Sequence, residues 1–176
     1  MKYLYLIRHA KSSWDDPSQT DFERTLNERG IKDAPKMAKL LQSKNVNPDL
    51  IISSPATRAF STAEIFAAQY KYPSEKILSD ARIYEAAMRD LAEVVHEIND
   101  EAETVFLFGH NPGISNFANL LSNQPVVDMP TCAIAGFELI INSWSEAERY
   151  CGKLILFEYP KKLTRSDSPT GKAGSC

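Results

Sequence analysis

The sequence predicts an α/β protein, a three-layer α/β/α sandwich with a mostly parallel central sheet. Two observations support this fold class. Short runs of apolar, β-forming residues alternate with longer runs whose apolar side chains recur at helical spacing, which is the pattern of repeated strand–helix units. The 176 residues are 43% hydrophobic and 24% charged, which suits one domain with its own core. We expect a single domain over residues 1–160 and a polar tail over residues 161–176.

The first third of the chain contains a strand, a loop and a helix. Residues 2–7 are mostly apolar and rich in β-formers, which predicts a short buried strand. Residues 12–26 are polar and contain turn-forming residues, so we expect a loop there. Asn27 is a candidate N-cap for the helix that follows, whose apolar positions recur at helical spacing as far as Leu41. Pro35 lies early in this helix, where a proline is best tolerated.

The remaining elements follow the same alternation. Strands are expected where short apolar runs recur, over residues 49–52, 76–78, 103–108, 133–141 and 153–159. Helices are expected over residues 55–70, 89–99 and 114–121, the first of them opening at Ser54 or Pro55. The last two strands are expected to be antiparallel at an edge of the sheet. From Lys161 onward the composition has no core-forming pattern.

Composition excludes several classes of protein. The net charge of −3 argues against a general nucleic-acid or membrane-surface binder, so no nucleic-acid or membrane partner is expected. No segment approaches the roughly 20 apolar residues of a membrane span, and the short apolar run at the start is not a signal peptide. Cys132, Cys151 and Cys176 lack metal or redox spacing, and their odd number favours free thiols in a reducing cytoplasm. The sequence gives no signal for the oligomeric state.

Polar side chains follow three of the predicted strands at the point where each ends. Carboxyl ends of parallel strands lie at one edge of a sheet, so these groups are expected to converge. Forked arginine side chains suit a tetrahedral oxyanion such as phosphate, and a neutral imidazole among them is a competent nucleophile toward phosphorus. The groups are Arg8 and His9 after the first strand, Ser53 and Arg58 after the second, and His110 and Asn111 after the fourth.

These motifs resemble those of the histidine phosphatase superfamily. Residues 6–10, Leu-Ile-Arg-His-Ala, resemble its Arg-His-Gly signature, with Ala10 in place of the usual glycine. Residues 53–63 and the Gly-His pair at 109–110 resemble its second and third motifs. Residues 8–14 and 21–30 are typical of the SixA-like phosphohistidine phosphatase branch. The resemblance covers about residues 2–159 and implies a phosphoglycerate mutase-like fold.

The resemblance also implies roles for individual residues. His9 is expected to be the nucleophile that becomes phosphorylated, with Arg8, Arg58 and His110 holding the phosphoryl group. Arg24 is expected to be a further phosphate contact, and Glu85 occupies the place where many members keep the acid that protonates the leaving group. Hydrogen bonds from Ser53 and Asn111 are expected to support the site. No cofactor is expected, and three scattered histidines do not make a metal-ligand set.

The leading hypothesis is a metal-independent phosphatase that removes phosphate from phosphohistidine on a protein, such as a histidine-phosphotransfer domain. Short connections over residues 12–26 and 72–87 favour an open site that admits a phosphate displayed on another protein. One alternative is a phosphatase of small phosphoesters with Glu85 as general acid. A second is a phosphate-binding module without turnover. A mutase fits less well, because it needs a closed site that shields its intermediate from water.

For four side chains, the sequence also supports an interpretation that is unrelated to catalysis. Arg24 could form a salt bridge with Glu23 or Glu28 on the surface, and Glu85 could be an ordinary loop carboxylate. Trp14 is expected to be a hydrophobic plug, with an exposed partner contact as the alternative. His96 is expected to be a surface or boundary residue, because no partner residues accompany it in the sequence.

Overall fold

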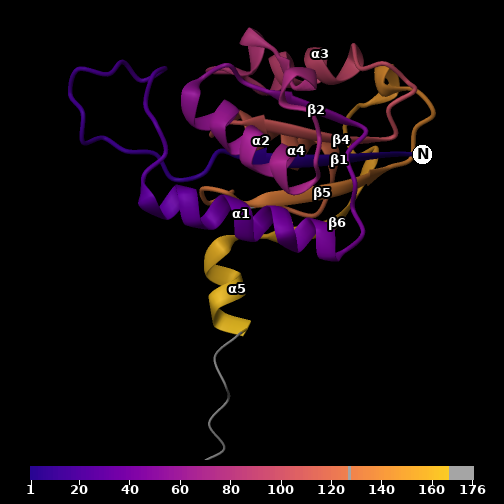
Figure 1. Cartoon of the computed structure of the whole chain (residues 1–176). Helices are drawn as coiled ribbons and strands as arrows, with labels where there is room; N and C mark the ends of the chain where they lie inside the picture. Colours follow the sequence, from indigo (N-terminus) through magenta and orange to yellow (C-terminus); the bar gives the residue numbers. More distant parts are fainter. Residues whose placement is uncertain (127, 167–176) are drawn as a thin grey trace, which may run out of the picture.

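The computed structural model describes residues 1–126 and 128–166, and it confirms an α/β fold built on one sheet (Figure 1). The strands, in the spatial order β3-β2-β4-β1-β5-β6, are β1 (Lys2–Arg8), β2 (Leu50–Ser53), β3 (Leu78–Ser79), β4 (Thr104–Gly109), β5 (Ile134–Leu139) and β6 (Gly152–Glu158). The α-helices are α1 (Glu28–Ser43), α2 (Thr57–Gln69), α3 (Met88–His96), α4 (Gly113–Leu121) and α5 (Pro160–Ser166).

The pairing of the strands agrees with the expected mostly parallel sheet. Neighbours β3, β2, β4 and β1 are parallel. Strand β5 pairs antiparallel with β1, and β6 pairs antiparallel with β5, which confirms two antiparallel strands at one edge. The expected strand over residues 76–78 is reduced to two residues and shifted to β3.

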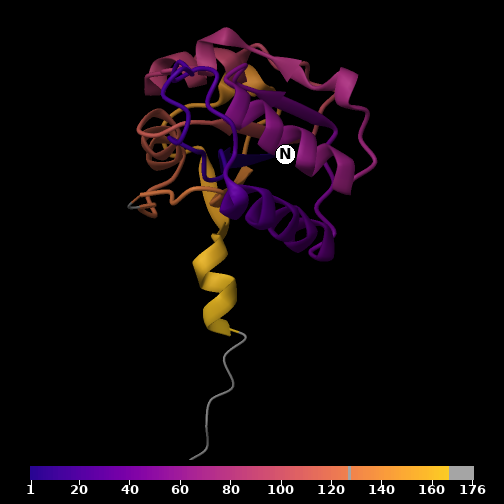
Figure 2. The ribbon, with the colours of Figure 1, turned by 60° about the vertical axis from the view of Figure 1, so that its left-hand side comes forward.

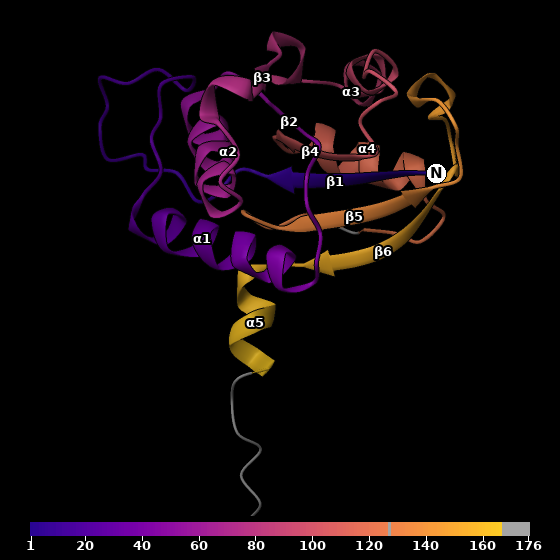
Figure 3. The ribbon, with the colours of Figure 1, turned by 45° about the vertical axis from the view of Figure 1, so that its right-hand side comes forward.

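The side chains of β1 alternate between the two faces of the sheet. Leu4 and Leu6 belong to the core that includes α3 and α4, whereas Tyr5 and Ile7 belong to the core that includes α1 and α2. Figures 1 and 3 show these two pairs of helices on opposite sides of the strands. A strand covered on both faces has a nearly continuous apolar sequence, which accounts for residues 2–7 and confirms the three layers.

Helix α1 is anchored at its start beside the end of β1. The Asn27 side chain accepts a hydrogen bond from the Gly30 amide at 2.9 Å, as expected for an N-cap. The first turn packs against the backbone of Lys11, because a Cβ built on Gly30 would lie only 2.2 Å from the Lys11 carbonyl oxygen. Glycine at position 30 therefore allows the helix to approach the segment that follows β1.

The carboxyl ends of the three central parallel strands are aligned by their register. Arg8 is paired with Gly109, and Ser53 with Phe108, so β1, β2 and β4 end side by side. The loop of residues 12–26 leaves this edge and projects from the body of the molecule (Figures 1 and 3). A bridge between Ser12 and Leu26 closes the base of the loop.

The first residues of the expected polar tail are helical. Residues 160–166 form helix α5, which projects beneath α1 (Figure 2). Leu163 is half-buried and packs against the core on the α1 and α2 side, and Lys162 forms an ion pair with Glu158 of β6 at 3.3 Å. Residues 167–176, including Cys176, lie outside the described residues, and the single domain over residues 1–160 stays a prediction.

Two further sequence expectations concern membrane-spanning helices and the cysteines. Across residues 1–126 and 128–166, no helix is long and apolar enough to cross a membrane. Cys132 is buried, Cys151 is half-buried, and both are free thiols.

Candidate active site

His9 follows β1 directly and is fixed by its backbone on both sides. Its amide donates to the Gly109 carbonyl at 3.1 Å, and its carbonyl accepts from the Cys132 amide at 3.0 Å. The imidazole Nδ1 lies 2.8 Å from the carbonyl oxygen of Ala10. Because a carbonyl oxygen only accepts, Nδ1 carries the proton and Nε2 keeps its lone pair.

The surroundings of His9 hold its imidazole neutral. Burial lowers the pKa of His9 to about 3, against the hydrogen bond to the Ala10 carbonyl, which raises it. The proximity of His110 and the positive charges of Arg58 and Arg8 lower the pKa further. At neutral pH the side chain is therefore an uncharged imidazole with a free lone pair on Nε2.

A second imidazole lies against the first. The ring centroids of His9 and His110 are 5.1 Å apart, with the planes tilted by 50°. Burial, followed by the charge of Arg58, lowers the pKa of His110 to about 4, although Asp21 opposes the shift. Both imidazoles are thus neutral in the resting site.

Ser54 determines which nitrogen of His110 carries the proton. Its hydroxyl oxygen lies 2.7 Å from Nε2 of His110 and accepts a hydrogen bond from the Ala56 amide at 3.2 Å. Ser54 is fully buried, so its hydroxyl proton needs an acceptor, and His110 Nε2 meets that need. The proton of His110 then resides on Nδ1.

Two arginines bring their guanidinium groups to the same histidines. Arg8 donates from Nη1 to the Met129 carbonyl at 2.7 Å, and Arg58 donates from Nη2 to Oδ2 of Asp21 at 3.0 Å. Both arginines influence the pKa of both histidines. Among the described residues, three of the four buried polar side-chain atoms without a hydrogen-bond partner belong to this site, namely Arg8 Nε, Arg58 Nε and His110 Nδ1.

Asp21 connects three segments around the site. Its carboxylate accepts hydrogen bonds from Tyr84 at 2.8 Å and from Arg24 and Arg58 at 3.0 Å each. Burial alone would raise the pKa of Asp21, but the hydrogen bonds from Tyr84 and Arg24 and the charge of Arg58 lower it to about 2. The loop of residues 12–26 is thereby held to α2 and to the segment before α3.

Arg24 is buried within the base of that loop. Its Nε donates to the Ser13 carbonyl at 3.0 Å, and Nη2 donates to the hydroxyl of Ser12. Its ion-pair partner is Asp21, whereas the sequence suggested Glu23 or Glu28. Its guanidinium carbon lies 3.3 Å from the ring centroid of Trp14.

The expectation that Trp14 is a hydrophobic plug is wrong. The side chain is 72% exposed. The guanidinium of Arg24 stacks on the indole ring. The indole is therefore held by a cation–π contact with Arg24 and is not buried in an apolar core. The alternative reading, an exposed residue available to a partner, agrees with this position.

The two supporting residues proposed from the sequence both donate hydrogen bonds to backbone carbonyls near the site. Ser53 is fully buried, and its hydroxyl donates to the Ser54 carbonyl at 2.9 Å. The Asn111 side-chain amide donates to the Met129 carbonyl at 3.0 Å, the same oxygen that accepts from Arg8. Both residues therefore hydrogen-bond to the backbone of Ser54 or Met129, and their support of the site stays a prediction.

Glu85 lies on the segment between the 3₁₀ turn at Ala81–Ile83 and α3. It is exposed, with a φ of 54°, and directly follows Tyr84. The Tyr84 ring packs edge-on against His110, with centroids 5.7 Å apart. This arrangement brings the segment of Glu85 to the site, whereas Glu85 itself is exposed.

Sequence reasoning gave no separate role to four residues that the structure places here. Ser54, Asp21 and Thr62 lie within the motifs quoted above, and Tyr84 precedes Glu85. Thr62 accepts from the Ala10 amide at 3.0 Å and donates to the Arg58 carbonyl at 2.7 Å, so it joins the segment after β1 to α2. The position of these residues within or beside a motif was the one indication in the sequence that they belong to the site. It did not indicate which side chains contact one another.

His96 is exposed and lies 2.7 Å from the Ala147 carbonyl through Nε2, which confirms a surface position. In the described part of the chain, no group of three or more His, Cys, Asp or Glu side chains is arranged to hold a metal ion.

Comparison with known proteins gives one consistent family. The model of the histidine phosphatase superfamily (branch 1) matches residues 4–113. A chloroplastic protein of Arabidopsis thaliana is 35% identical over 152 residues, which are 82% of this chain and 69% of that protein. The structure of SixA from Agrobacterium tumefaciens superposes with a TM-score of 0.77 at 27% identity, covering 90% of this chain and 98% of that one.

A second solved structure has the same fold. It is a protein histidine phosphatase SixA complexed with tungstate, with a TM-score of 0.78 at 20% identity, covering 92% of this chain and 99% of that one. These likenesses confirm the fold class expected from the sequence.

Proposed function

This chain belongs to the histidine phosphatase superfamily, and we propose that it is a phosphatase that removes phosphate from histidine side chains of other proteins through a phosphohistidine intermediate on His9. One observation carries the proposal. A neutral His9, with its lone pair on Nε2, shares a buried site with three N–H groups that lack partners among the described residues. Such donors fit the oxygens of a phosphoryl group.

In the first step His9 Nε2 attacks the phosphorus, and a new N–P bond forms. The bond between phosphorus and the leaving nitrogen breaks, its electron pair stays with the leaving imidazole, and that imidazole takes a proton from water. The Ala10 carbonyl keeps the Nδ1 proton in place while His9 becomes positively charged. Arg8 and Arg58 offset the charge of the phosphoryl oxygens, and His110 donates from Nδ1.

In the second step water attacks the phosphorus of phosphorylated His9. The N–P bond breaks, its electron pair returns to Nε2, and inorganic phosphate leaves. The proton of the water passes to the released phosphate or to solvent. The same guanidinium groups stabilise both transition states, because the phosphoryl group stays between them while the nucleophile and leaving group change.

A phosphorylated histidine is the substrate class that the surroundings of the site favour. An imidazole is a better leaving group than an alkoxide and needs less help from an acid, and the Glu85 carboxylate is exposed. The site lies at the edge of the sheet beside a projecting loop (Figure 1), which suits a phosphate displayed on another protein. We also propose the cytoplasm as the compartment, in keeping with the free thiols of Cys132 and Cys151.

The test is phosphate release from a histidine-phosphorylated histidine-phosphotransfer domain and from several small phosphoesters, with wild-type protein and His9→Ala in parallel. We expect preferential turnover of the phosphorylated domain, its loss in His9→Ala, and no inhibition by EDTA. Strong inhibition by EDTA would contradict a metal-independent reaction. A protein that binds vanadate but hydrolyses no substrate would instead be a phosphate-binding module.

The second candidate is a phosphatase of small phosphoesters, with Glu85 as the acid that protonates the leaving oxygen. The observation in its favour is that Glu85 follows Tyr84, whose ring contacts His110. Under this alternative, Glu85→Gln lowers turnover of a small phosphoester by about 100-fold or more, as expected for loss of a general acid. Under the leading proposal, Glu85→Gln changes turnover of the phosphorylated domain much less.

A further inference from the structure

A large aromatic side chain stands exposed beside the site. Trp14 is 72% exposed, whereas the other tryptophan, Trp144, is fully buried. The Arg24 guanidinium covers one face of the Trp14 indole at 3.3 Å, and Arg24 is itself 9% exposed and tied to Ser13 and Asp21. The indole is therefore held in one orientation with its other face in water. A rigid, exposed aromatic side chain is typical of the energetic centre of a protein interface.

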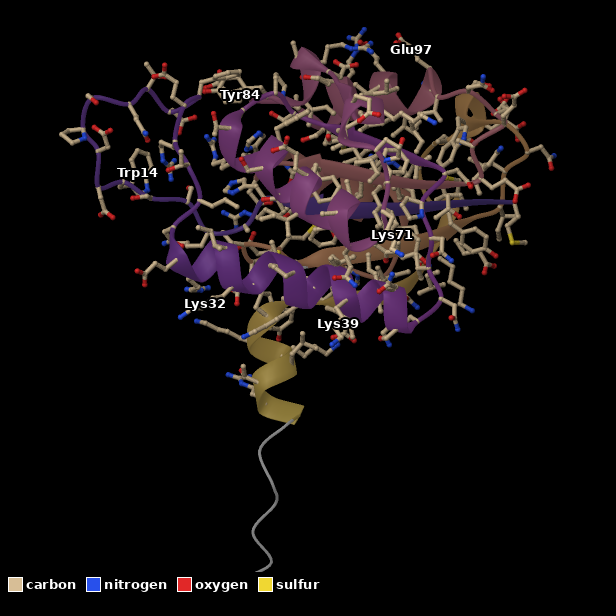
Figure 4. The ribbon with its side chains drawn as sticks, viewed as in Figure 1. Trp14, Lys32, Lys39, Lys71, Tyr84 and Glu97 are labelled. Carbon is tan, nitrogen blue, oxygen red and sulfur yellow. The ribbon has the colours of Figure 1, made fainter. Side chains whose placement is uncertain are left out.

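A series of contacts leads from Trp14 to the site. Trp14 stacks on Arg24, Arg24 is bonded to Asp21, and Asp21 is bonded to Arg58. Two side chains thus separate Trp14 from the guanidinium proposed to hold phosphate. A ligand that contacts both Arg58 and Trp14 is larger than a small phosphoester. Figure 4 shows Trp14 on the loop that projects from the molecule.

The charges around Trp14 indicate which protein surface would fit. Asp15 and Asp16, the next two residues, are both exposed. Within residues 11–26, Lys11 is the one exposed cation, because Arg24 is buried and paired with Asp21. Exposed carboxylates attract basic groups and repel a ligand that carries only negative charge. The loop therefore favours a phosphate that is accompanied by basic side chains.

We propose that Trp14, together with Asp15 and Asp16, forms the docking surface for the protein substrate. The partner is a histidine-phosphorylated protein with apolar and basic side chains next to the phosphorylated residue. This inference rests on the proposed function and adds the surface that selects the substrate. Trp14 contacts the partner protein, while His9 and its neighbours contact the phosphate.

The kinetic test compares two substrates with the same leaving group, a histidine-phosphorylated histidine-phosphotransfer domain and phosphoimidazole. In Trp14→Ala we expect the ratio of kcat/KM for the domain to kcat/KM for phosphoimidazole to fall by about tenfold or more, the usual effect of removing an interface anchor. Asp15→Lys is expected to lower the ratio as well. The matched control is Tyr150→Ala, an exposed aromatic beside Arg149 near the start of β6, at the opposite edge of the sheet. It should leave the ratio unchanged.

The binding test uses the fluorescence of Trp14. Because Trp144 is buried, acrylamide quenches mainly Trp14. The His9→Ala variant is used because it prevents turnover. Adding a tryptophan-free phosphorylated domain to it should reduce this quenching. The double variant His9→Ala with Tyr150→Ala should show the same reduction. Unchanged quenching overturns the docking surface, and so does an unchanged kinetic ratio in Trp14→Ala.

Failure of the proposed function would look different. If neither substrate releases phosphate, or if His9→Ala retains turnover, the catalytic proposal is wrong, whereas the quenching still reports whether Trp14 meets the phosphorylated domain. If Trp14→Ala lowers turnover of both substrates equally, Trp14 acts through Arg24 alone, and the docking surface is wrong while the catalytic proposal stands.

Discussion

The hydroxyl of Ser54 donates a hydrogen bond to Nε2 of His110 across 2.7 Å. This bond places the proton of His110 on Nδ1, the nitrogen that has no partner among the described residues. A protonated Nδ1 can donate to a phosphoryl oxygen, whereas the other tautomer would present a lone pair to an anion. In the proposed mechanism, Ser54 is therefore a positioning residue that acts through His110.

Ser54→Ala is expected to lower kcat by about tenfold to 100-fold, because His110 loses the bond that sets its tautomer. The direct measurement is ¹⁵N NMR of the His110 ring, which should show the proton moving from Nδ1 toward Nε2. Ser122→Ala is the matched control. Ser122 is also buried and also accepts from the amide two residues later, at 3.1 Å from Gln124, but it lies at the end of α4. Ser122→Ala should change the free energy of unfolding without changing kcat. If Ser122→Ala lowered kcat as much as Ser54→Ala does, the role assigned to Ser54 would be contradicted.

The depressed pKa values of His9 and His110 predict a specific pH dependence of stability. Both histidines titrate lower in the folded protein, at about 3 and about 4, than in an unfolded chain, at about 6.5. The unfolded state therefore binds more protons below about pH 6.5, and the free energy of unfolding decreases as the pH falls from there toward the folded values. Each histidine contributes at most about 1.4 kcal/mol per pH unit.

The measurement is urea unfolding between pH 7 and pH 4.5. His110→Gln should have a shallower pH dependence than the wild type, because one of the two groups is gone. The same slope in both proteins would contradict a depressed pKa for His110. His9 stays neutral across this pH range, so kcat should not fall between pH 7 and pH 5. A nucleophilic imidazole with an ordinary pKa would become protonated over this range, and kcat would fall.

Gly30 is predicted to be essential for the approach of α1 to the site. In Gly30→Ala the new Cβ would lie 2.2 Å from the carbonyl oxygen of Lys11, so the backbone must move. We expect a loss of about 2–4 kcal/mol in the free energy of unfolding, measured with urea. Lys32→Ala, at an exposed position of the same helix, should change it by about 0.5 kcal/mol or less. A mild effect of Gly30→Ala would show that the helix start can shift freely.

The convergence of the central groups was predictable from the sequence because it depends on topology. Once residues 2–7, 49–52 and 103–108 are parallel strands of one sheet, their carboxyl ends must share an edge. Arg8, His9 and His110 follow those ends directly, so no side-chain detail was needed to bring them together. The buried strands were also predictable from the sequence, because a strand that is covered on both faces has apolar side chains at nearly every position.

The contacts around this centre were not predictable, because they depend on which way single side chains point. Ser53 and Ser54 are adjacent and chemically equal, but Ser53 is the last residue of β2 and Ser54 the first residue after it, and Ser54 is the one that meets His110. Trp14 is apolar, and composition alone favours burial. Its exposed position depends on Arg24, ten residues later, and on a loop whose shape no periodic pattern describes.

Asp21 illustrates how such a long-range contact governs the proposed reaction. Its carboxylate fixes the Arg58 guanidinium and lowers the local positive charge. In Asp21→Asn, Arg58 loses its ion pair, so kcat is expected to fall by about tenfold or more, as for other misplaced phosphate-binding groups. The site also becomes more positive, so inorganic phosphate and vanadate should bind more tightly, and KM should fall together with kcat.

Tyr84→Phe removes a single hydrogen bond to Asp21 and leaves its charge, so it should change kcat by only about threefold. Steady-state kinetics and vanadate inhibition measure both effects. If Asp21→Asn raised KM and left kcat unchanged, Asp21 would serve substrate binding and would not position Arg58.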